Sequence, residues 1–182
     1  MLYRWRTIVM DIFLEYIVSR KKGAKEILKI VAILLAMLIL LTLSTFLLLT
    51  PLSSIAFLLV AGIIYGAYYL ISGQNVEYEY IVTNGELDVD SIVNRRKRKR
   101  LITVHSRTFD IVAPVGDTRY RNEENANFTR VIDASSRVNN GKAYFAVFSK
   151  DGQKIKLVFE PTEKMLEAFK TFVPRNVFMR EM

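Results

Sequence analysis

Residues 30–76 read IVAILLAMLILLTLSTFLLLTPLSSIAFLLVAGIIYGAYYLISGQNV and contain no charged side chain. The hydrocarbon core of a bilayer, about 30 Å thick, is crossed by a helix of roughly 20 apolar residues. An uncharged stretch of 47 residues is therefore too long for one membrane-spanning helix and long enough for two. The sequence predicts an integral membrane protein with two spans.

The break between the two spans lies at Thr50-Pro51-Leu52-Ser53-Ser54. Pro51 lacks a backbone N–H and disfavours helix at the residue before it. We predict a first span over Lys29–Leu49 and a second that reaches Ile71, forming a transmembrane hairpin over residues 29–73. A cleavable signal peptide is a poorer interpretation of the first span, because its apolar run exceeds the roughly 7–15 residues of such signals.

Basic residues near the span ends set the orientation of the hairpin. Five precede the first span: Arg20, Lys21, Lys22, Lys25 and Lys29. Six follow the second at moderate distance: Arg95, Arg96, Lys97, Arg98, Lys99 and Arg100. The connecting turn carries none, so we expect a two-span protein of the cell membrane with both termini in the cytoplasm.

Gly62 and Gly66 form a G-x-x-x-G pair within the second span. Such pairs allow two helix backbones to approach closely. The pair is consistent with a homodimer through the membrane. Packing of the second span on the first within one hairpin is the favoured interpretation, because the short turn already brings the two spans together.

The N-terminal segment, residues 1–28, is predicted to contain an amphipathic helix. Apolar residues recur there at helical spacing: Trp5, Ile8, Val9, Ile12, Phe13, Tyr16 and Ile17. This helix would lie flat on the inner leaflet, or it would pack on the cytoplasmic domain as an ordinary core helix.

The remaining domain, residues 74–182, reads as seven strands followed by one helix. The predicted strands cover residues 78–82, 86–90, 101–105, 108–113, 128–133, 143–148 and 155–159, and Asn84-Gly85 is a strong hairpin signal between the first two. Apolar residues at helical spacing then predict a helix with Pro161 in its first turn and its end before Pro174. The fold class is α+β.

Seven antiparallel strands and a C-terminal helix in about 100 residues resemble the pleckstrin-homology-like β-sandwich or barrel. The whole layout is similar to an uncharacterised bacterial family of small two-span membrane proteins. In that family a segment like Tyr78–Asp88 precedes a basic run, and a segment like Phe159-Glu160-Pro161 opens the last helix. The resemblance implies a cytoplasmic domain of this fold and transfers no catalytic residues.

The basic run Arg95-Arg96-Lys97-Arg98-Lys99-Arg100 has three possible interpretations. It contacts anionic lipid, where each basic residue near the surface gains ~1 kcal/mol. Alternatively it is a solvated loop that sets topology and pairs with Glu86, Asp88 and Asp90, an acidic strand face expected to be solvated. Nucleic-acid binding is the weakest interpretation, because no aromatic residue interrupts the run for base stacking.

No constellation in the sequence predicts catalysis. The chain has no cysteine and a single histidine, His105, so a histidine- or cysteine-rich metal site is excluded. Ser106 and Asp110 lie near His105 only in sequence, which does not make a catalytic triad. We expect no enzymatic activity, no cofactor, no metal and no small-molecule substrate.

The sequence thus favours a non-enzymatic, membrane-anchored binding or scaffold module. Its partners would be membrane lipids and, through Gly62 and Gly66, a protein partner or a second copy of the chain. Nucleic acid is not among the expected partners. The alternative is a structural subunit of a larger membrane complex, such as a transporter or secretion assembly.

Overall fold

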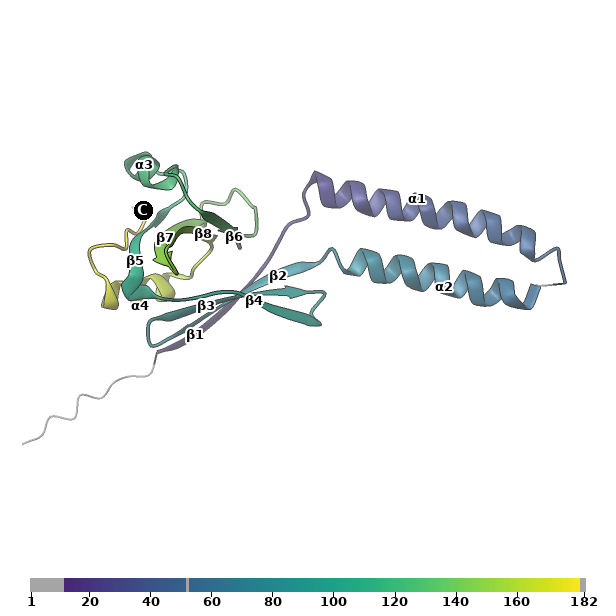
Figure 1. Ribbon diagram of the computed structural model, residues 1–182, viewed down its shortest axis with the longest axis horizontal. Helices are drawn as coiled ribbons and strands as arrows, with labels where there is room; N and C mark the ends of the chain where they lie inside the picture. The colour runs from purple at the N-terminus through teal and green to yellow at the C-terminus, as the bar shows by residue number, and fades with distance from the viewer. Residues whose placement is uncertain (1–11, 52, 181–182) are drawn as a thin grey trace, which may run out of the picture. The chain divides into compact units, whose positions relative to one another are not determined.

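The computed structural model describes residues 12–51 and 53–180 of an α+β chain (Figure 1). Contacts between residues divide the chain into two compact units. We call the first the strand unit; it comprises the described residues of 12–18, 78–91 and 99–180. The second, the helical unit, comprises the described residues of 19–77 and 92–98.

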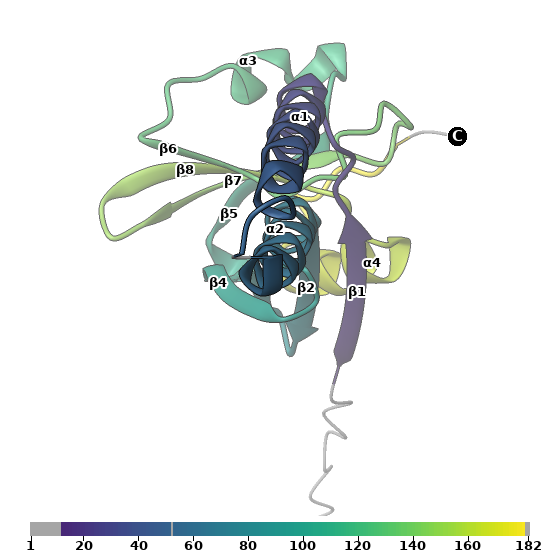
Figure 2. The ribbon, with the colours of Figure 1, turned by 90° about the vertical axis from the view of Figure 1, so that its right-hand side faces the viewer.

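The helical unit contains two long helices, α1 (Ala24–Leu47) and α2 (Ser53–Ser72). They lie side by side and run in opposite directions (Figures 1 and 2). The least exposed residues recur every three or four positions, as in a coiled coil: Ile30, Ile33, Met37, Leu41 and Ser44 on α1, and Ala56, Val60, Ile63 and Ala67 on α2. The other faces expose large apolar side chains, among them Leu35, Leu38, Phe57 and Leu58.

Both helices are long and apolar enough to cross a membrane. α1 begins at Ala24, before Lys29, where the span was predicted to start. The Glu26 side chain caps the first turn of this helix. The Glu26 carboxylate accepts a hydrogen bond of 3.0 Å from the backbone N–H of Gly23, one of the four N–H groups that a helix start leaves without a helical partner. A charged turn therefore precedes the apolar part of α1.

The first sheet has the order β1-β2-β3-β4. Its strands are β1 (Phe13–Ser19), β2 (Val76–Thr83), β3 (Glu86–Val93) and β4 (Lys97–His105). The last three were predicted, and each extends further than its predicted span.

The predicted amphipathic helix is wrong over residues 13–19, which form strand β1; residues 1–11 lie outside the described part of the chain. Phe13–Ser19 reads FLEYIVS, rich in the β-branched and aromatic residues that favour strands. β1 pairs with the edge of β2. Arg20 N–H donates to the Val76 carbonyl (3.0 Å), and Asn84 N–H donates to the Ile12 carbonyl (3.0 Å). The same residues fit a helical pattern because apolar side chains occupy both faces of the strand.

The second sheet has the order β5-β7-β8-β6 (Figure 2). Its strands are β5 (Phe109–Pro114), β6 (Arg130–Asp133), β7 (Tyr144–Lys150) and β8 (Gln153–Phe159). β7 pairs antiparallel with β5 and β8, but β6 pairs parallel with β8. The expected seven-stranded, wholly antiparallel arrangement is therefore corrected to eight strands in two sheets among the described residues. The parallel pair arises because the segment after Asp133 carries the chain away from β8 before β7 returns to it.

Short helical turns interrupt the strands at η1 (Ser106–Thr108), η2 (Thr118–Tyr120) and α3 (Arg121–Glu124). The predicted C-terminal helix is present as α4 (Glu163–Phe172). Pro161 precedes it rather than lying in its first turn, since the Thr162 hydroxyl is the N-cap and accepts from Met165 N–H (3.3 Å).

The core of the strand unit lies between the two sheets and α4. The Phe169 ring of α4 packs edge-on against Phe109 of β5, with centroids 5.4 Å apart, and lies 6.4 Å from the Phe159 ring of β8. Other fully buried side chains of this unit come from both sheets: Tyr80, Val82, Leu87, Val89, Phe148 and Leu157. A second cluster contains Phe145 with Ile111, Ala113 and Val147. Removal of this apolar surface from water is the main stabilisation of the unit.

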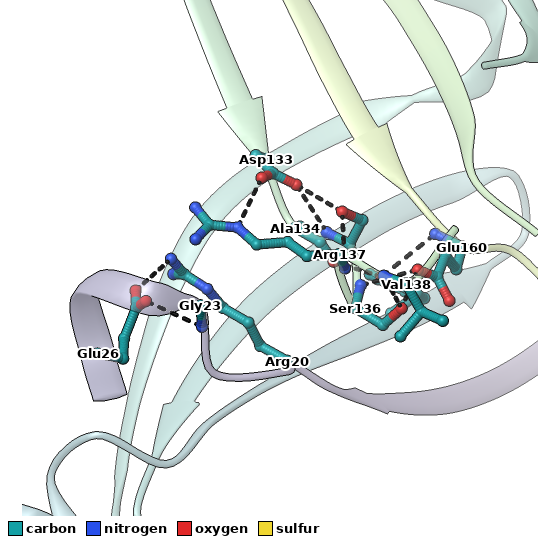
Figure 3. A network of polar contacts seen from close by, with 11 residues as sticks. Arg20, Gly23, Glu26, Asp133, Ala134, Ser136, Arg137, Val138 and Glu160 are labelled. Carbon is teal, nitrogen blue, oxygen red and sulfur yellow. Dashed lines mark hydrogen bonds and ion pairs between the residues drawn. The ribbon is translucent and has the colours of Figure 1, made fainter. Parts of the chain in front are cut away.

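A buried polar network holds the segment after β6 (Figure 3). Glu160, 5% exposed, accepts hydrogen bonds from the backbone N–H and hydroxyl of Ser136 at 2.8 and 2.5 Å. Tyr80 donates its hydroxyl to the Ala134 carbonyl at 2.5 Å. A buried carboxylate requires such partners, so Glu160 is a structural residue.

Candidate functional site

The basic run begins in the tight turn between β3 and β4. Arg96 N–H donates to the Val93 carbonyl (3.1 Å), and the two central residues, Asn94 and Arg95, have φ values of 52° and 53°. Two positive φ angles are the signature of a type I′ hairpin turn, in which Asn is favoured first and Gly second. Asn94 is therefore the sequence signal for this turn, while Arg95 takes a position that suits glycine.

A backbone hydrogen bond holds this turn beside the C-terminal end of α2. Asn94 N–H donates to the carbonyl of Asn75 (2.8 Å), three residues past the last residue of α2. The Glu77 carboxylate accepts from Arg95 Nε and from the Ser19 hydroxyl, each at 3.4 Å. The end of β1, the start of β2 and the β3–β4 turn thus meet at one point of the helical unit.

A polar cleft of about 310 Å³ lies at this point. Its lining comes from the three segments: Ser19, Arg20, Asn75, Val76, Glu77, Asn94 and Arg95. Sequence reasoning identified Arg20 and Arg95 as basic residues near the spans and missed the rest. Ser19 and Glu77 stand 58 positions apart, and only the pairing of β1 with β2 brings them together.

Nearly all of the net charge of the protein is carried by the helical unit. Nine Lys/Arg and two Glu give it +7, against +8 for the whole chain. We call the nine cations the basic collar: Arg20, Lys21, Lys22, Lys25, Lys29, Arg95, Arg96, Lys97 and Arg98. Arg20 pairs with Glu26 (3.1 Å; Figure 3) and Arg95 with Glu77 (3.4 Å). The side chains of the predicted run are all exposed.

The predicted run is not one continuous site, because Lys99 and Arg100 belong to the strand unit. Arg100 forms ion pairs with Asp90 and with Asp88, the latter at 2.5 Å. The hydrogen bond that Arg100 donates to Asp90, with the nearby charge of Asp88, raises the pKa of Arg100 above its usual value. Pairing of the run with the preceding strand, one of the predicted alternatives, is thus found for Arg100.

Asp90 is 2% exposed, so the expectation that Glu86, Asp88 and Asp90 form a solvated face is wrong at Asp90. The reason is that Arg100 lies over it and supplies the counter-charge that a buried carboxylate needs.

Gly62 and Gly66 do not lie in the contact between α1 and α2. A Cβ built at either residue would meet no heavy atom within 4 Å. The positions that pack in the pair are instead Ala56 and Ala67, which are 0% and 7% exposed. Space for a side chain therefore exists at both positions, of which Gly62 is exposed and Gly66 half-buried.

The His105 side chain makes contacts within the fold. Its Nδ1 accepts a hydrogen bond from Arg107 N–H (3.1 Å), and its ring packs edge-on against Phe172 of α4, with centroids 5.7 Å apart. Ser106 is fully buried beside it, and its hydroxyl has no hydrogen-bond partner among the described residues. The structure brings neither Ser106 nor Asp110 into a hydrogen bond with the imidazole among its described contacts.

The chain matches the family described as bacterial PH-like domain (DUF6106) over residues 10–179. No curated protein and no solved structure matches the chain. The matched range includes α1 and α2 as well as both sheets, so the apolar helices are part of what defines the family. The chain belongs to this family.

Proposed function

We propose, from membership of the bacterial PH-like domain family, that this protein is a membrane-anchored binding or scaffold module and not an enzyme. α1 and α2 would cross the cell membrane, and the PH-like domain would remain in the cytoplasm. The basic collar would contact the anionic inner leaflet.

The exposure of the helices supports the membrane anchor. Only 6% of the most apolar window of α1 and 11% of that of α2 is buried, whereas a core helix of a water-soluble protein is mostly buried. At 1.5 Å per residue, 20 residues of α2 span ~30 Å, the thickness of the hydrocarbon core. Lipid is the environment in which this apolar surface carries no cost.

The location of the charge carries the lipid proposal. The +7 of the helical unit lies at the ends of α1 and α2 that connect to the strands, while the turn between the helices carries no charge. This asymmetry orients the collar toward the cytoplasm. A cationic segment near anionic lipid gains ~1 kcal/mol per Lys or Arg, so the collar would hold the neighbouring domain at the surface.

Topology is tested by cysteine labelling in intact bacterial cells. The native chain has no cysteine, so Ser54→Cys at the start of α2 and Ser149→Cys in β7 are clean probes. We expect a membrane-impermeant maleimide to label Ser54→Cys only. Labelling of Ser149→Cys from outside would place the domain outside the cell and overturn the proposal.

The lipid contact is tested on the full chain extracted in mild detergent. We expect co-purified lipid to be enriched in anionic headgroups relative to the host membrane. A variant with Lys21, Lys22, Arg96, Lys97 and Arg98 all changed to Gln should lose that enrichment. An unchanged lipid profile would remove the lipid part of the proposal.

One observation favours a second candidate, a structural subunit of a larger membrane complex. A Cβ at Gly62 or Gly66 would meet no heavy atom within 4 Å among the described residues, and G-x-x-x-G faces commonly receive another helix. Chemical cross-linking in native membranes should then give a defined oligomer or heteromer that Gly62→Leu abolishes. A chain that stays monomeric and partner-free would exclude this candidate.

A further inference from the structure

The polar cleft lies at the depth of the lipid headgroups if α2 spans the membrane, and the inference below rests on that part of the proposed function. α2 ends at Ser72, and the first cleft residue along the chain after it is Asn75. A 20-residue helix matches the hydrocarbon thickness, so the cleft falls in the layer just outside the hydrocarbon.

The cleft offers both donors and acceptors for a headgroup. Arg95 uses Nε to reach Glu77, and its side chain is 86% exposed, so both terminal NH₂ groups remain available. A guanidinium binds a phosphate through two parallel N–H donors. Glu77, with Ser19 beside it, provides acceptors for hydroxyl groups.

The backbone at Arg95 gives independent support. Its φ of 53° is a left-handed conformation that is strained for a residue other than glycine. The other Asn-started hairpin turn of the same sheet has Gly85 at the equivalent position, with φ 88°. The β3–β4 turn retains a strained arginine where glycine is unstrained, and strain of this kind is found at binding sites.

We propose that the cleft binds the headgroup of an anionic glycerophospholipid whose phosphodiester also carries free hydroxyl groups, as a phosphoglycerol headgroup does. Arg95 holds the phosphate through its terminal NH₂ groups. Glu77 orients Arg95 and accepts a hydrogen bond from a headgroup hydroxyl. The rest of the collar attracts anionic lipid without selecting it.

The test compares two variants that each remove one collar charge. Arg95 lines the cleft, whereas Lys97 lies outside it. The full chain in mild detergent is titrated with short-chain phosphatidylglycerol, phosphatidic acid and phosphatidylcholine, and bound lipid is counted by native mass spectrometry. We expect Arg95→Gln to weaken phosphatidylglycerol binding about tenfold more than Lys97→Gln does, because Arg95→Gln removes a charge-assisted hydrogen bond in addition to a collar charge.

The outcomes of this titration distinguish the headgroup-binding cleft from the lipid part of the proposed function. Equal losses in the two variants would overturn the cleft and leave the collar as a cationic surface that binds anionic lipid without selecting a headgroup. No preference of the wild type for anionic lipid would overturn the lipid part of the proposed function itself. Tighter binding of inorganic phosphate than of phosphatidylglycerol, measured by calorimetry, would make the cleft a site for a soluble phosphate and overturn the lipid assignment.

Two further variants test the roles of the residues. Arg95→Gly removes the guanidinium and the strain together, so it should raise the thermal midpoint of the full chain while phosphatidylglycerol binding falls. Glu77→Gln should reduce the preference for phosphatidylglycerol over phosphatidic acid, which lacks the headgroup hydroxyls. An Arg95→Gly chain with unimpaired lipid selectivity would contradict the proposal.

Discussion

The Tyr80 hydroxyl on β2 accepts a hydrogen bond of 3.3 Å from the backbone N–H of Glu160, 80 residues later in the chain. Tyr80 is fully buried, and burial raises the pKa of its hydroxyl far above the usual value. The hydroxyl therefore stays protonated and donates to the Ala134 carbonyl. One side chain thus joins the first sheet to the segments that follow β6 and β8.

Tyr80→Phe tests this link. The substitution leaves the amide of Glu160 and the carbonyl of Ala134 without the hydroxyl, and each buried group that loses its partner costs ~1–3 kcal/mol. We expect a loss of that order in the free energy of unfolding, measured by urea titration of the full chain in mild detergent. Tyr68→Phe on the exposed face of α2 is the control and should change nothing. A wild-type stability in Tyr80→Phe would contradict the role of the hydroxyl.

Gly85 in the β2–β3 turn is required for two reasons. Its φ is 88°, and a Cβ there would lie 2.7 Å from the Phe172 ring of α4. Gly152 has a similar φ of 74° with nothing within 4 Å, so it separates the two effects. Gly152→Ala should cost ~1–2 kcal/mol from backbone strain alone. Gly85→Ala should cost a further ~1–3 kcal/mol from overpacking, seen as a lower urea midpoint; equal costs would exclude the steric contribution.

Asp133 makes the stability of the protein pH-dependent. Burial raises the pKa of its carboxyl, but hydrogen bonds from the Ser135 hydroxyl and amide and from Arg137 outweigh burial and lower it. A folded-state pKa below the unfolded value of about 3.9 gives stability that is present above that value and is lost as the pH falls through the folded pKa.

We therefore expect Asp133→Asn to lower the thermal midpoint at pH 7 and to bring it closer to the wild-type midpoint as the pH falls through the folded-state pKa, because the wild-type carboxyl is then protonated. Asp110→Asn, an exposed residue on β5 whose carboxylate has no hydrogen bond among the described contacts, is the matched control. A constant difference between Asp133→Asn and the wild type at all pH values would show that the carboxylate charge is not involved.

The two faces of α2 should respond differently to large residues. Ala56 is fully buried against α1, so Ala56→Leu overpacks the helix pair and should destabilise it by ~1–3 kcal/mol. Gly62→Leu adds bulk where nothing lies within 4 Å and should leave the pair intact. Cysteines introduced on facing positions of α1 and α2 report this as efficient cross-linking in Gly62→Leu and weak cross-linking in Ala56→Leu. The reverse result would show that the glycine face is the packed one.

The sequence was most informative where one physical constraint acts alone. The charge-free run of residues 30–76 predicted two long apolar helices, and period-two alternation with the Asn84-Gly85 turn predicted the strands from β2 onward. The final helix followed from its apolar spacing and from Pro174. Each of these signals is local to the element that it predicts.

Features that depend on distant partners were missed. Phe13–Ser19 fits a helix and a strand equally well, and only the open edge of β2, about 60 residues later, selects the strand. The burial of Asp90 depends on Arg100 of the next strand, and the cleft combines residues from three segments. The parallel pairing of β6 with β8 likewise depends on the course of the intervening chain.

The position of the helices within the first sheet has a consequence for how the protein is made. β1 and β2 are neighbours in the sheet, yet α1 and α2 separate them in the chain. During synthesis β1 must wait until both helices have left the ribosome before it can meet its partner, so the sheet is completed only after both helices have been made.

The same arrangement indicates how a water-soluble version should be built. Cutting the chain after α2 would discard β1 and expose the edge of β2, a site for edge-to-edge aggregation. Arg20 N–H lies only 3.0 Å from the Val76 carbonyl. A short glycine-containing turn from Arg20 to Val76 would therefore replace both helices and keep the eight strands in one continuous polypeptide.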